Sequence, residues 1–367
     1  MTLQRQIGFW IACLGGLVVF LYLFSGVLTP FVAALILAYL LDPLVDWLER
    51  MRLGRLAATS LVLLLFVLIF VVILLAVMPL LVNQLSALIA KMPQYVARLQ
   101  TLMTEQGGPL FERFGGEGRL KEVQGQLASG LGEGAKWLGG LFTSLLSGGG
   151  VILNVISLLV LTPVVAFYMI LDWDRMVAKV DGWLPLAQRD TIRGLVSEMD
   201  QSVAGFLRGQ ATICIVLGLF YAVGLSLAGL NFGFAIGIVS GLINFIPYVG
   251  SITGLVLSLG VAVAQFWPDW TMVLVILGIF AAGQFLEGNV LQPKLLGHAL
   301  GLHPVWLMFA LLAFGSLFGF VGIMLAVPLA AVIGVLVRFA LRQYLASPLY
   351  HGYRLPSAPK GEGIIDP

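Results

Sequence analysis

Charged residues are scarce in this sequence. Asp, Glu, Lys and Arg together make up 10% of the 367 residues, whereas 60% are hydrophobic, and the mean hydropathy is +1.02. A soluble globular domain carries about 25% charged residues. No water-soluble fold of this length could bury so much apolar surface, so lipid must cover it. The apolar runs are continuous rather than alternating, which excludes a β-barrel and predicts an all-α polytopic membrane protein.

Cysteine is also scarce, and the signatures of enzymes are missing. Cys13 and Cys214 lie in apolar runs far apart in the sequence, so a disulfide is not expected. The net charge of +2 does not indicate a nucleic-acid partner. The sequence has no His-Glu-x-x-His zinc motif and no phosphate-binding loop ending in Gly-Lys-Ser/Thr. The acidic pair in Asp172-Trp173-Asp174 is more typical of a helix exit with a Trp anchor than of a metal site. We therefore expect no enzymatic activity, no metal and no cofactor.

Alternation between charge-free and charged segments predicts about eight transmembrane helices, some of them interrupted or re-entrant. The short basic loop that contains Arg50, Arg52 and Arg55 favours cytoplasmic N- and C-termini. The predicted segments are residues 1–82 (transmembrane helices 1–3), 83–149 (an extracytoplasmic amphipathic helical insert), 150–171 (transmembrane helix 4), 172–208 (a cytoplasmic or interfacial amphipathic segment), 209–345 (a transmembrane core with interrupted helices) and 346–367 (a cytoplasmic tail).

Several helix breaks are predicted from Gly and Pro. Residues 6–41 are too long for one span, and Ser25, Gly26 and Pro30 indicate a helical hairpin. The segment 172–208 is expected to lie along the membrane surface and to turn inward at Gly209.

The start of the insert has an amphipathic pattern. Apolar residues recur at steps of three and four between residues 81 and 103, which predicts one apolar helix face. This face could pack against the second helix of the insert. It could also form a contact between protomers, because helix–helix seams use the same spacing.

A polar island interrupts the C-terminal apolar half. Between Arg208 and Arg338 the only formal charges are Asp269, Glu287 and Lys294, and two of these lie within residues 284–304. A carboxylate deep in a membrane is costly unless it is paired or protonated. Glu287 could therefore lie at the interface beside Lys294, or it could be buried and carry a proton during a transport cycle.

A second polar stretch lies in a charge-free run. In residues 244–251, Pro247 removes a backbone donor and frees the carbonyl of Ile243, which Asn244 and Ser251 could help to satisfy. Such a break at membrane depth survives only where protein or trapped water covers it. The break is either purely structural or part of a discontinuous helix that lines a cavity.

These two stretches supply the candidate pathway residues. They are Asn244, Pro247, Tyr248, Gly250, Ser251, Gln284, Glu287, Asn289, Gln292, Lys294 and His303. His298 and His303 could titrate near neutral pH, but they are also typical of interfacial polar residues or of a cap before Pro304. The candidate gate or hinge residues are Gly315, Gly319, Gly322 and Pro328.

A faint internal repeat links the two halves of this region. A shift of 72 positions places residues 247–250 on residues 319–322, and both copies are apolar segments broken in the middle. Paired interrupted segments point to the binding site of a transporter. Chance similarity between Gly-rich apolar sequences explains the match equally well.

Seven short motifs follow one another along the chain. They are Leu41-Asp42-Pro43, Phe206-Leu207-Arg208-Gly209-Gln210, Gly241-Leu242-Ile243-Asn244-Phe245-Ile246-Pro247-Tyr248-Val249-Gly250, Glu287-Gly288-Asn289-Val290-Leu291-Gln292-Pro293-Lys294, Gly301-Leu302-His303-Pro304, Gly315-Ser316-Leu317-Phe318-Gly319 and Ala326-Val327-Pro328. In this order they resemble the autoinducer-2 exporter family of transporters. The resemblance covers nearly the whole chain apart from residues 83–149.

The resemblance implies a multi-pass permease of the bacterial or archaeal inner membrane. One branch of the family is associated with export of the signal molecule autoinducer-2, and another with sodium (lithium)/proton antiport. We therefore predict a secondary transporter that exports a small polar molecule such as autoinducer-2. An antiporter and a non-transporting membrane scaffold are the alternatives. The predicted partners are the lipid bilayer, a small polar solute or a monovalent cation or proton, and further copies of the chain.

Overall fold

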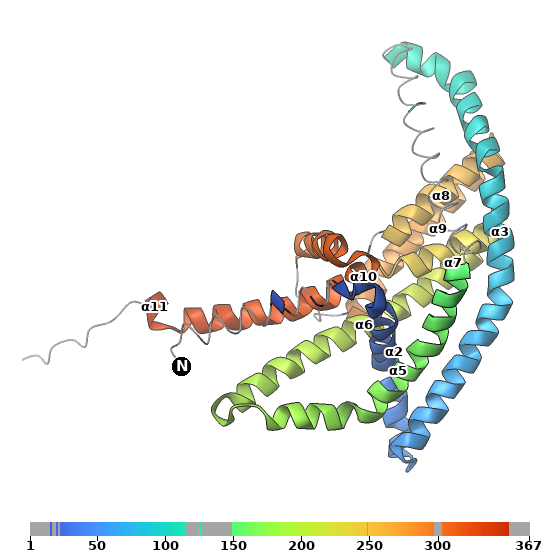
Figure 1. The fold of residues 1–367 in the computed structure, drawn as a ribbon. Coiled ribbons are helices and arrows are strands. Elements are labelled where there is room, and N and C mark those ends of the chain that lie inside the picture. The colour runs from blue at the N-terminus through green and yellow to red at the C-terminus, as the bar shows by residue number, and fades with distance from the viewer. Residues whose placement is uncertain are drawn as a thin grey trace, which may run out of the picture.

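The computed structural model describes residues 15–16, 20, 23–114, 125, 149–247, 249–296 and 303–351. Every regular element in these ranges is a helix (Figure 1). In chain order they are α2 (Ser25–Arg50), α3 (Arg55–Phe114), α5 (Gly149–Gly182), η1 (Leu186–Gln188), α6 (Arg189–Leu227), α7 (Gly233–Ile243), α8 (Val249–Phe266), α9 (Trp270–Leu286), η2 (Glu287–Leu296), α10 (Pro304–Leu345) and α11 (Pro348–His351).

Six helical stretches in the described residues are long and apolar enough to cross a membrane. They are Leu28–Arg50, Arg55–Arg98, Leu186–Leu227, Val249–Phe266, Trp270–Leu296 and Val305–Leu345. Large apolar side chains on these helices face outward: Leu64 is 69% exposed and Leu75 is 68% exposed. A bilayer would cover such a surface. The prediction of an all-α polytopic membrane protein is confirmed, whereas the expected number of eight spans is not.

Helix α3 connects two packed groups of helices. It has 60 residues, which at 1.5 Å per residue makes it about 90 Å long, and it runs along one whole side of the molecule (Figure 1). Near its start, Ala58 and Val62 are buried in a core shared with α2 and α5. Further along, Leu88 and Met92 are buried in a second core formed with α6, α7, α8 and α9.

The first part of the amphipathic stripe at residues 81–103 packs against the transmembrane helices, while the side chains of Leu99 and Met103 lie outside the described set and the two expected uses stay predictions there. Leu88 and Met92 are 1% and 6% exposed and pack in the same core as Ile213 and Leu217 of α6. These side chains are therefore covered by the same protomer. The change in composition at Asn83 is not a helix boundary, because α3 continues through it. The second amphipathic stretch predicted after residue 120 lies outside the described ranges.

Helices α6 and α7 form a hairpin in which small residues let the two backbones touch. A Cβ atom added to Gly237 would collide with the backbone of Ala222, and one added to Gly241 would collide with the backbone of Gly218. Glycine at every fourth position puts all the small residues on one helix face. Gly233, Gly237 and Gly241 therefore let α7 pack directly against the backbone of α6.

The expected turn at Gly209 is wrong. Helix α6 continues without interruption from Arg189 to Leu227. Gly209 instead makes a close approach: a Cβ atom there would lie 2.9 Å from the carbonyl oxygen of Leu295 and 2.8 Å from Cδ2 of Leu296. The absence of a side chain at Gly209 therefore allows α6 to pack closely against η2, and the helix does not change direction there.

The predicted break in the C-terminal half is present, whereas the helical hairpin predicted around Ser25, Gly26 and Pro30 stays a prediction, and Pro30 lies inside α2. Helix α2 begins at Ser25, while the first helix predicted before it falls almost wholly outside the described residues. Helix α10 is kinked at Gly319, where φ is 59° and ψ is −136°, a conformation that is essentially restricted to glycine. Beyond the kink, a Cβ atom on Gly322 would collide with the carbonyl oxygen of Phe314, so the two halves of α10 fold tightly against each other. Pro328 is buried within the second half.

Both copies of the faint repeat are breaks between helices. The first lies between α7 and α8, where a Cβ atom on Gly250 would collide with the backbone of Asn244 and Ser240. The second lies at Gly319. In each copy a glycine three residues after the start of the matched segment packs on the backbone of the preceding helix half. This shared contact supports the repeat independently of composition.

Candidate functional site

A buried carboxylate lies at the junction of α9 and η2. Glu287 is only 5% exposed. Three side-chain amides donate hydrogen bonds to it: Asn244 Nδ2 to Oε1 at 3.1 Å, Gln284 Nε2 to Oε2 at 3.1 Å and Gln292 Nε2 to Oε1 at 3.4 Å. These amides take the place of water around the carboxylate. We call Glu287, Asn244, Gln284, Gln292 and Gln210 (described below) the amide–carboxylate cluster.

The helix geometry of η2 brings Gln292 to Glu287. In an α-helix, residues five apart point about 140° away from each other. Residues Glu287–Leu296 instead form a π-helix, whose i→i+5 bonding widens the turn so that residues five apart face the same side. π-Helical segments are rare and occur frequently at functional sites. The wide turn therefore adds a donor to Glu287 that a regular helix would have turned away.

Asn244 is the C-cap residue of α7, and a hydrogen bond from α6 holds its backbone in place. Its side chain is 1% exposed, and its backbone carbonyl accepts a hydrogen bond of 2.6 Å from Nε2 of Gln210, which is 3% exposed. The carbonyl of Ile243, freed by Pro247, accepts from the backbone N–H of Ile246 at 2.9 Å. The break is thus satisfied locally, and the Asn244 side chain remains available to Glu287.

One acceptor in the cluster has no partner. Oδ1 of Asn244 is buried and receives no hydrogen bond in the described residues. A buried acceptor without a partner costs free energy, so it is expected to serve a state in which something donates to it. An amide group presents a donor on one side and an acceptor on the other. The cluster could therefore satisfy a protonated or an ionised Glu287, or it could offer oxygen ligands to a cation.

The cluster has a buried side and an outer side. Asn244 and Gln210 lie in the interior, whereas Gln284 is on an exposed part of α9 and Gln292 is half-buried. The cluster thus extends from the α6–α7 hairpin toward the surface of α9. A row of amide groups with this direction offers donors and acceptors from the interior to the surface of α9.

The structure does not bring every candidate from the polar island into the cluster. Asn289 is exposed, and its amide donates to the carbonyl of Phe285 on its own helix at 3.2 Å. Lys294 is exposed and has no ion pair with any acid in the described residues. His303 is exposed and caps α10, with Nδ1 accepting from the N–H of Val305 at 3.4 Å. Glu287 is therefore buried and solvated by amides, not paired with Lys294 at an interface.

The remaining candidates lie around the first break. Gly250 packs against Asn244, Ser251 is 5% exposed and Pro247 is half-buried. Tyr248 and His298 lie outside the described residues. Gln210 was not among the sequence candidates. The sequence feature that could have identified it is its position as a polar amide two residues after Arg208, at the start of a charge-free run.

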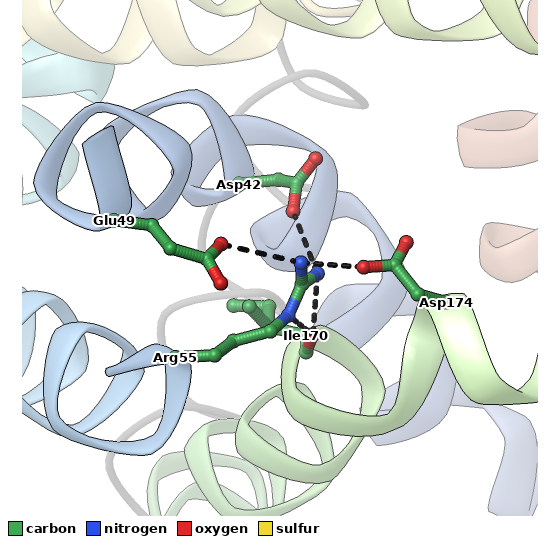
Figure 2. A network of polar contacts seen from close by, with 5 residues as sticks. All are labelled: Asp42, Glu49, Arg55, Ile170 and Asp174. Atoms are coloured by element: carbon green, nitrogen blue, oxygen red, sulfur yellow. Dashed lines mark hydrogen bonds and ion pairs between the residues drawn. The ribbon is translucent and has the colours of Figure 1, made fainter. Parts of the chain in front are cut away.

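A separate polar network joins the N-terminal helices (Figure 2). Arg55, the first residue of α3, donates from Nε and Nη2 to the carbonyl oxygen of Ile170 at 3.2 and 3.0 Å. Its guanidinium also faces Asp174 at 2.6 Å, Glu49 at 3.5 Å and Asp42 at 3.8 Å. One guanidinium thereby holds α2, α3 and α5 together.

The Asp172-Trp173-Asp174 motif takes part in ion pairing. Asp174 pairs with Arg55, and Asp172 pairs with Arg175 at 3.2 Å. Within the described ranges, no three His, Cys, Asp or Glu side chains are grouped closely enough to hold a metal ion.

Comparison with known proteins gives one consistent family. The sequence profile of the AI-2E family transporters matches residues 7–342. The chain is 30% identical to YrrI of Bacillus subtilis (strain 168), over 85% of this chain and 86% of that protein. It is 30% identical to PerM of Escherichia coli (strain K12), over 86% and 88%. It is 28% identical to the AI-2 transport protein TqsA of Escherichia coli (strain K12), over 87% and 86%.

Proposed function

The chain belongs to the AI-2E transporter family, and from this premise we propose that it is a secondary transporter of the bacterial inner membrane that moves a small polar molecule past the amide–carboxylate cluster. The observation that carries the proposal is the burial of Glu287 among three amide donors, with no cation paired to it in the described residues. A buried ionisable group in a membrane protein marks a substrate, ion or proton path.

Glu287 is suited to couple transport to a proton. When it is ionised, the amides of Asn244, Gln284 and Gln292 donate to its oxygens. When it is protonated, its O–H can donate to the acceptor side of an amide, and Oδ1 of Asn244 has no other partner. Because Nδ2 and Oδ1 belong to the same amide, protonation of Glu287 would turn the Asn244 side chain and so act on the end of α7.

The cargo that suits this cluster is small, uncharged and rich in hydroxyl groups. Each amide can donate to a hydroxyl oxygen and accept from a hydroxyl hydrogen. TqsA is named an AI-2 transport protein, which supports autoinducer-2 as the first molecule to test. Export rather than import is part of the proposal.

A second candidate, sodium (or lithium)/proton antiport, is favoured by one observation. Oδ1 of Asn244 is a buried oxygen without a donor, adjacent to a carboxylate. Hard cations take oxygen ligands of this kind. A cation bound there would replace the proton on Glu287.

The experiment is transport by purified protein in proteoliposomes under imposed proton and sodium gradients. We expect autoinducer-2 flux that rises with the proton gradient in the native protein and loses this dependence in Glu287→Gln. The matched control is Asp269→Asn, because Asp269 is the other acid of the charge-poor half and its role is to cap α9, accepting from Thr271 N at 2.9 Å. Proton-coupled flux that survives in Glu287→Gln would remove the mechanism. Sodium-driven proton movement without autoinducer-2 flux would favour the second candidate.

The topology is also a proposal. We assign residues 83–149 to the outer side of the membrane, and residues 172–208 and the tail 346–367 to the cytoplasm, on the basis of the basic loop at Arg50, Arg52 and Arg55. Labelling of single cysteines by a membrane-impermeant maleimide in intact cells tests this arrangement. A cysteine placed at Thr101 should react from outside, and one placed at Gln188 should react only after lysis; the reverse pattern would invert the topology.

A further inference from the structure

A polar cavity separate from the amide–carboxylate cluster lies where α2, α5 and α6 meet. Its volume is about 310 Å³. Tyr39 and Asp42 line it from α2, Trp173 lines it from α5, and α6 contributes its face from Asp200 to Arg208. The volume is at the lower end of the range of small-molecule sites, about 300–1,000 Å³. We call this space the α2–α5–α6 cavity.

Tyr39 holds the α6 side chains in place. Its hydroxyl group donates to Oδ1 of Asp200 at 2.8 Å, and its backbone carbonyl accepts from Nε of Arg208 at 2.8 Å. Asp200 and Arg208 are eight residues apart, about 12 Å along the helix axis. Both side chains therefore contact Tyr39, although their positions on α6 are about two helical turns apart.

The opposite charges in the cavity do not neutralise each other. In the described part of the chain, Asp42 has an ion pair with Arg55 at 3.8 Å, which lies outside the cavity lining, and Arg208 has no ion pair at all. Arg208 uses Nε for its contact with Tyr39, so its two terminal nitrogens are left to face the cavity or solvent. Arg208 therefore has no carboxylate bound to it, although Asp42 and Asp200 line the same small cavity, and this arrangement suits a ligand that carries both signs of charge.

We propose that the α2–α5–α6 cavity binds a small zwitterion, with its anionic group on Arg208 and its ammonium group toward Asp42 and Asp200. A guanidinium binds a carboxylate or phosphate with two parallel hydrogen bonds, and an ammonium group supplies three donors. The rings of Tyr39 and Trp173 lie edge to face with centroids 6.2 Å apart, and aromatic faces attract ammonium groups.

The charge arrangement discriminates against simpler ions. An anion would enter a cavity that holds two carboxylates, and a cation would meet Arg208. Asp200 and Arg208 are exposed, so a singly charged ligand is disfavoured by repulsion from the like charge in the cavity and not by loss of water. Two sources supply the required chemistry: a free amino acid in the aqueous phase, and the headgroup of phosphatidylethanolamine in the bilayer.

The test measures binding by the full-length protein without transport, so it does not depend on the role of Glu287. The protein is placed in nanodiscs of phosphatidylglycerol alone or with phosphatidylethanolamine, and its melting temperature is recorded with each of the twenty amino acids. Amino acids that raise it are then compared by calorimetry with their amide and N-acetyl derivatives, which each lack one charge. The variants are Arg208→Gln, Asp200→Asn and Arg208→Lys. The control variant is Arg175→Gln, since Arg175 is 82% exposed and pairs only with Asp172.

If the ligand is a free amino acid, it should raise the melting temperature in phosphatidylglycerol discs, whereas its amide and N-acetyl derivatives should not. A lipid headgroup as ligand predicts a rise only when phosphatidylethanolamine is present. In either case Arg208→Gln and Asp200→Asn should weaken binding at least tenfold, Arg208→Lys should restore part of it, and Arg175→Gln should not change it. The proposal is overturned if no zwitterion stabilises the protein, if the singly charged derivatives bind equally well, or if monodisperse Arg208→Gln protein binds as the native protein does.

Discussion

The side-chain amide of Asn244 donates a hydrogen bond of 3.1 Å to Oε1 of Glu287, so the residue that ends α7 is bonded to the residue at which α9 becomes a π-helix. The two residues are 43 positions apart in the sequence. This contact joins the break between α7 and α8 to the only carboxylate that is buried in the described residues. A change of charge on Glu287 therefore acts directly on Asn244 at the end of α7, where the helix is broken.

Removal of the Asn244 side chain should impair transport and stability together. In Asn244→Ala, Oε1 of Glu287 keeps only the longer bond from Gln292, and loss of a donor to a buried carboxylate costs about 1–3 kcal/mol. We expect flux to fall at least tenfold and the melting temperature in detergent to decrease. Asn289→Ala is the matched control, because that amide is exposed and bonds only to its own helix. Equal losses in the two variants would contradict the assigned role.

A methyl group at Gly237 should force α6 and α7 apart. Its Cβ atom would collide with the backbone of Ala222, and overpacking of this kind costs about 1–3 kcal/mol. We expect Gly237→Ala to lower the melting temperature. In Gly278→Ala on α9 the added Cβ has no atom within 4 Å, and alanine is about 1 kcal/mol more favourable than glycine in a helix. This control should be neutral or stabilising. A stable Gly237→Ala protein would show that the hairpin can separate at little cost.

Replacement of Arg55 by lysine should destabilise the packing of α2, α3 and α5. An ammonium group cannot reproduce the two hydrogen bonds to the Ile170 carbonyl while it also faces Asp174, because it lacks the planar fork of a guanidinium. We expect Arg55→Lys to lower stability by about 1–3 kcal/mol, measured by thermal unfolding in detergent. Arg175→Lys, which alters an exposed pair, should have no measurable effect. If both variants melt alike, the Arg55 network is not important for stability.

The turn between α5 and α6 should loosen only in acid. Hydrogen bonds from Arg193 and Arg189 hold the pKa of Asp181 well below its usual range. Because the folded pKa lies below the unfolded value of about 3.9, the stabilisation is fully present above about pH 4 and is lost as the pH falls through the folded pKa. The fluorescence of Trp183, which is 80% exposed in this turn, should be constant from pH 8 to pH 5 and change below pH 4.

The variant Asp181→Asn isolates this ion pair from other acids that titrate in the same range. It should show the loosened turn already at neutral pH, with little further change in acid. A transition centred between pH 5 and pH 7 in the native protein would point to a different group.

Much of the site could be predicted from sequence because its polar residues stand out against an apolar background. Asn244, Gln284, Glu287 and Gln292 were identified in this way, and the structure brings these four together. Asn289 and Lys294 lie in the same stretch but face outward. Which residues of one short segment face inward depends on the π-helical winding, and sequence spacing alone assumes 3.6 residues per turn.

Gln210 shows the opposite case. A single amide in an apolar run gives no indication of its partner, and its hydrogen bond to the Asn244 carbonyl spans 34 residues. The packing that makes this bond possible is the close approach of Gly241 to Gly218. That approach depends on two helices meeting, which no local pattern specifies.

The sequence by itself determined the membrane class, the helical fold, the breaks near Pro247 and Gly319, and the presence of a carboxylate in an apolar region. These features follow from composition and from short-range steric effects, which act within a few residues along the chain. Only the tertiary structure decided that α3 continues through Asn83, that α6 does not turn at Gly209, and that Glu287 is surrounded by amides and not paired with Lys294. Those outcomes depend on contacts between distant helices, where the close packing of small residues determines which polar groups can reach one another.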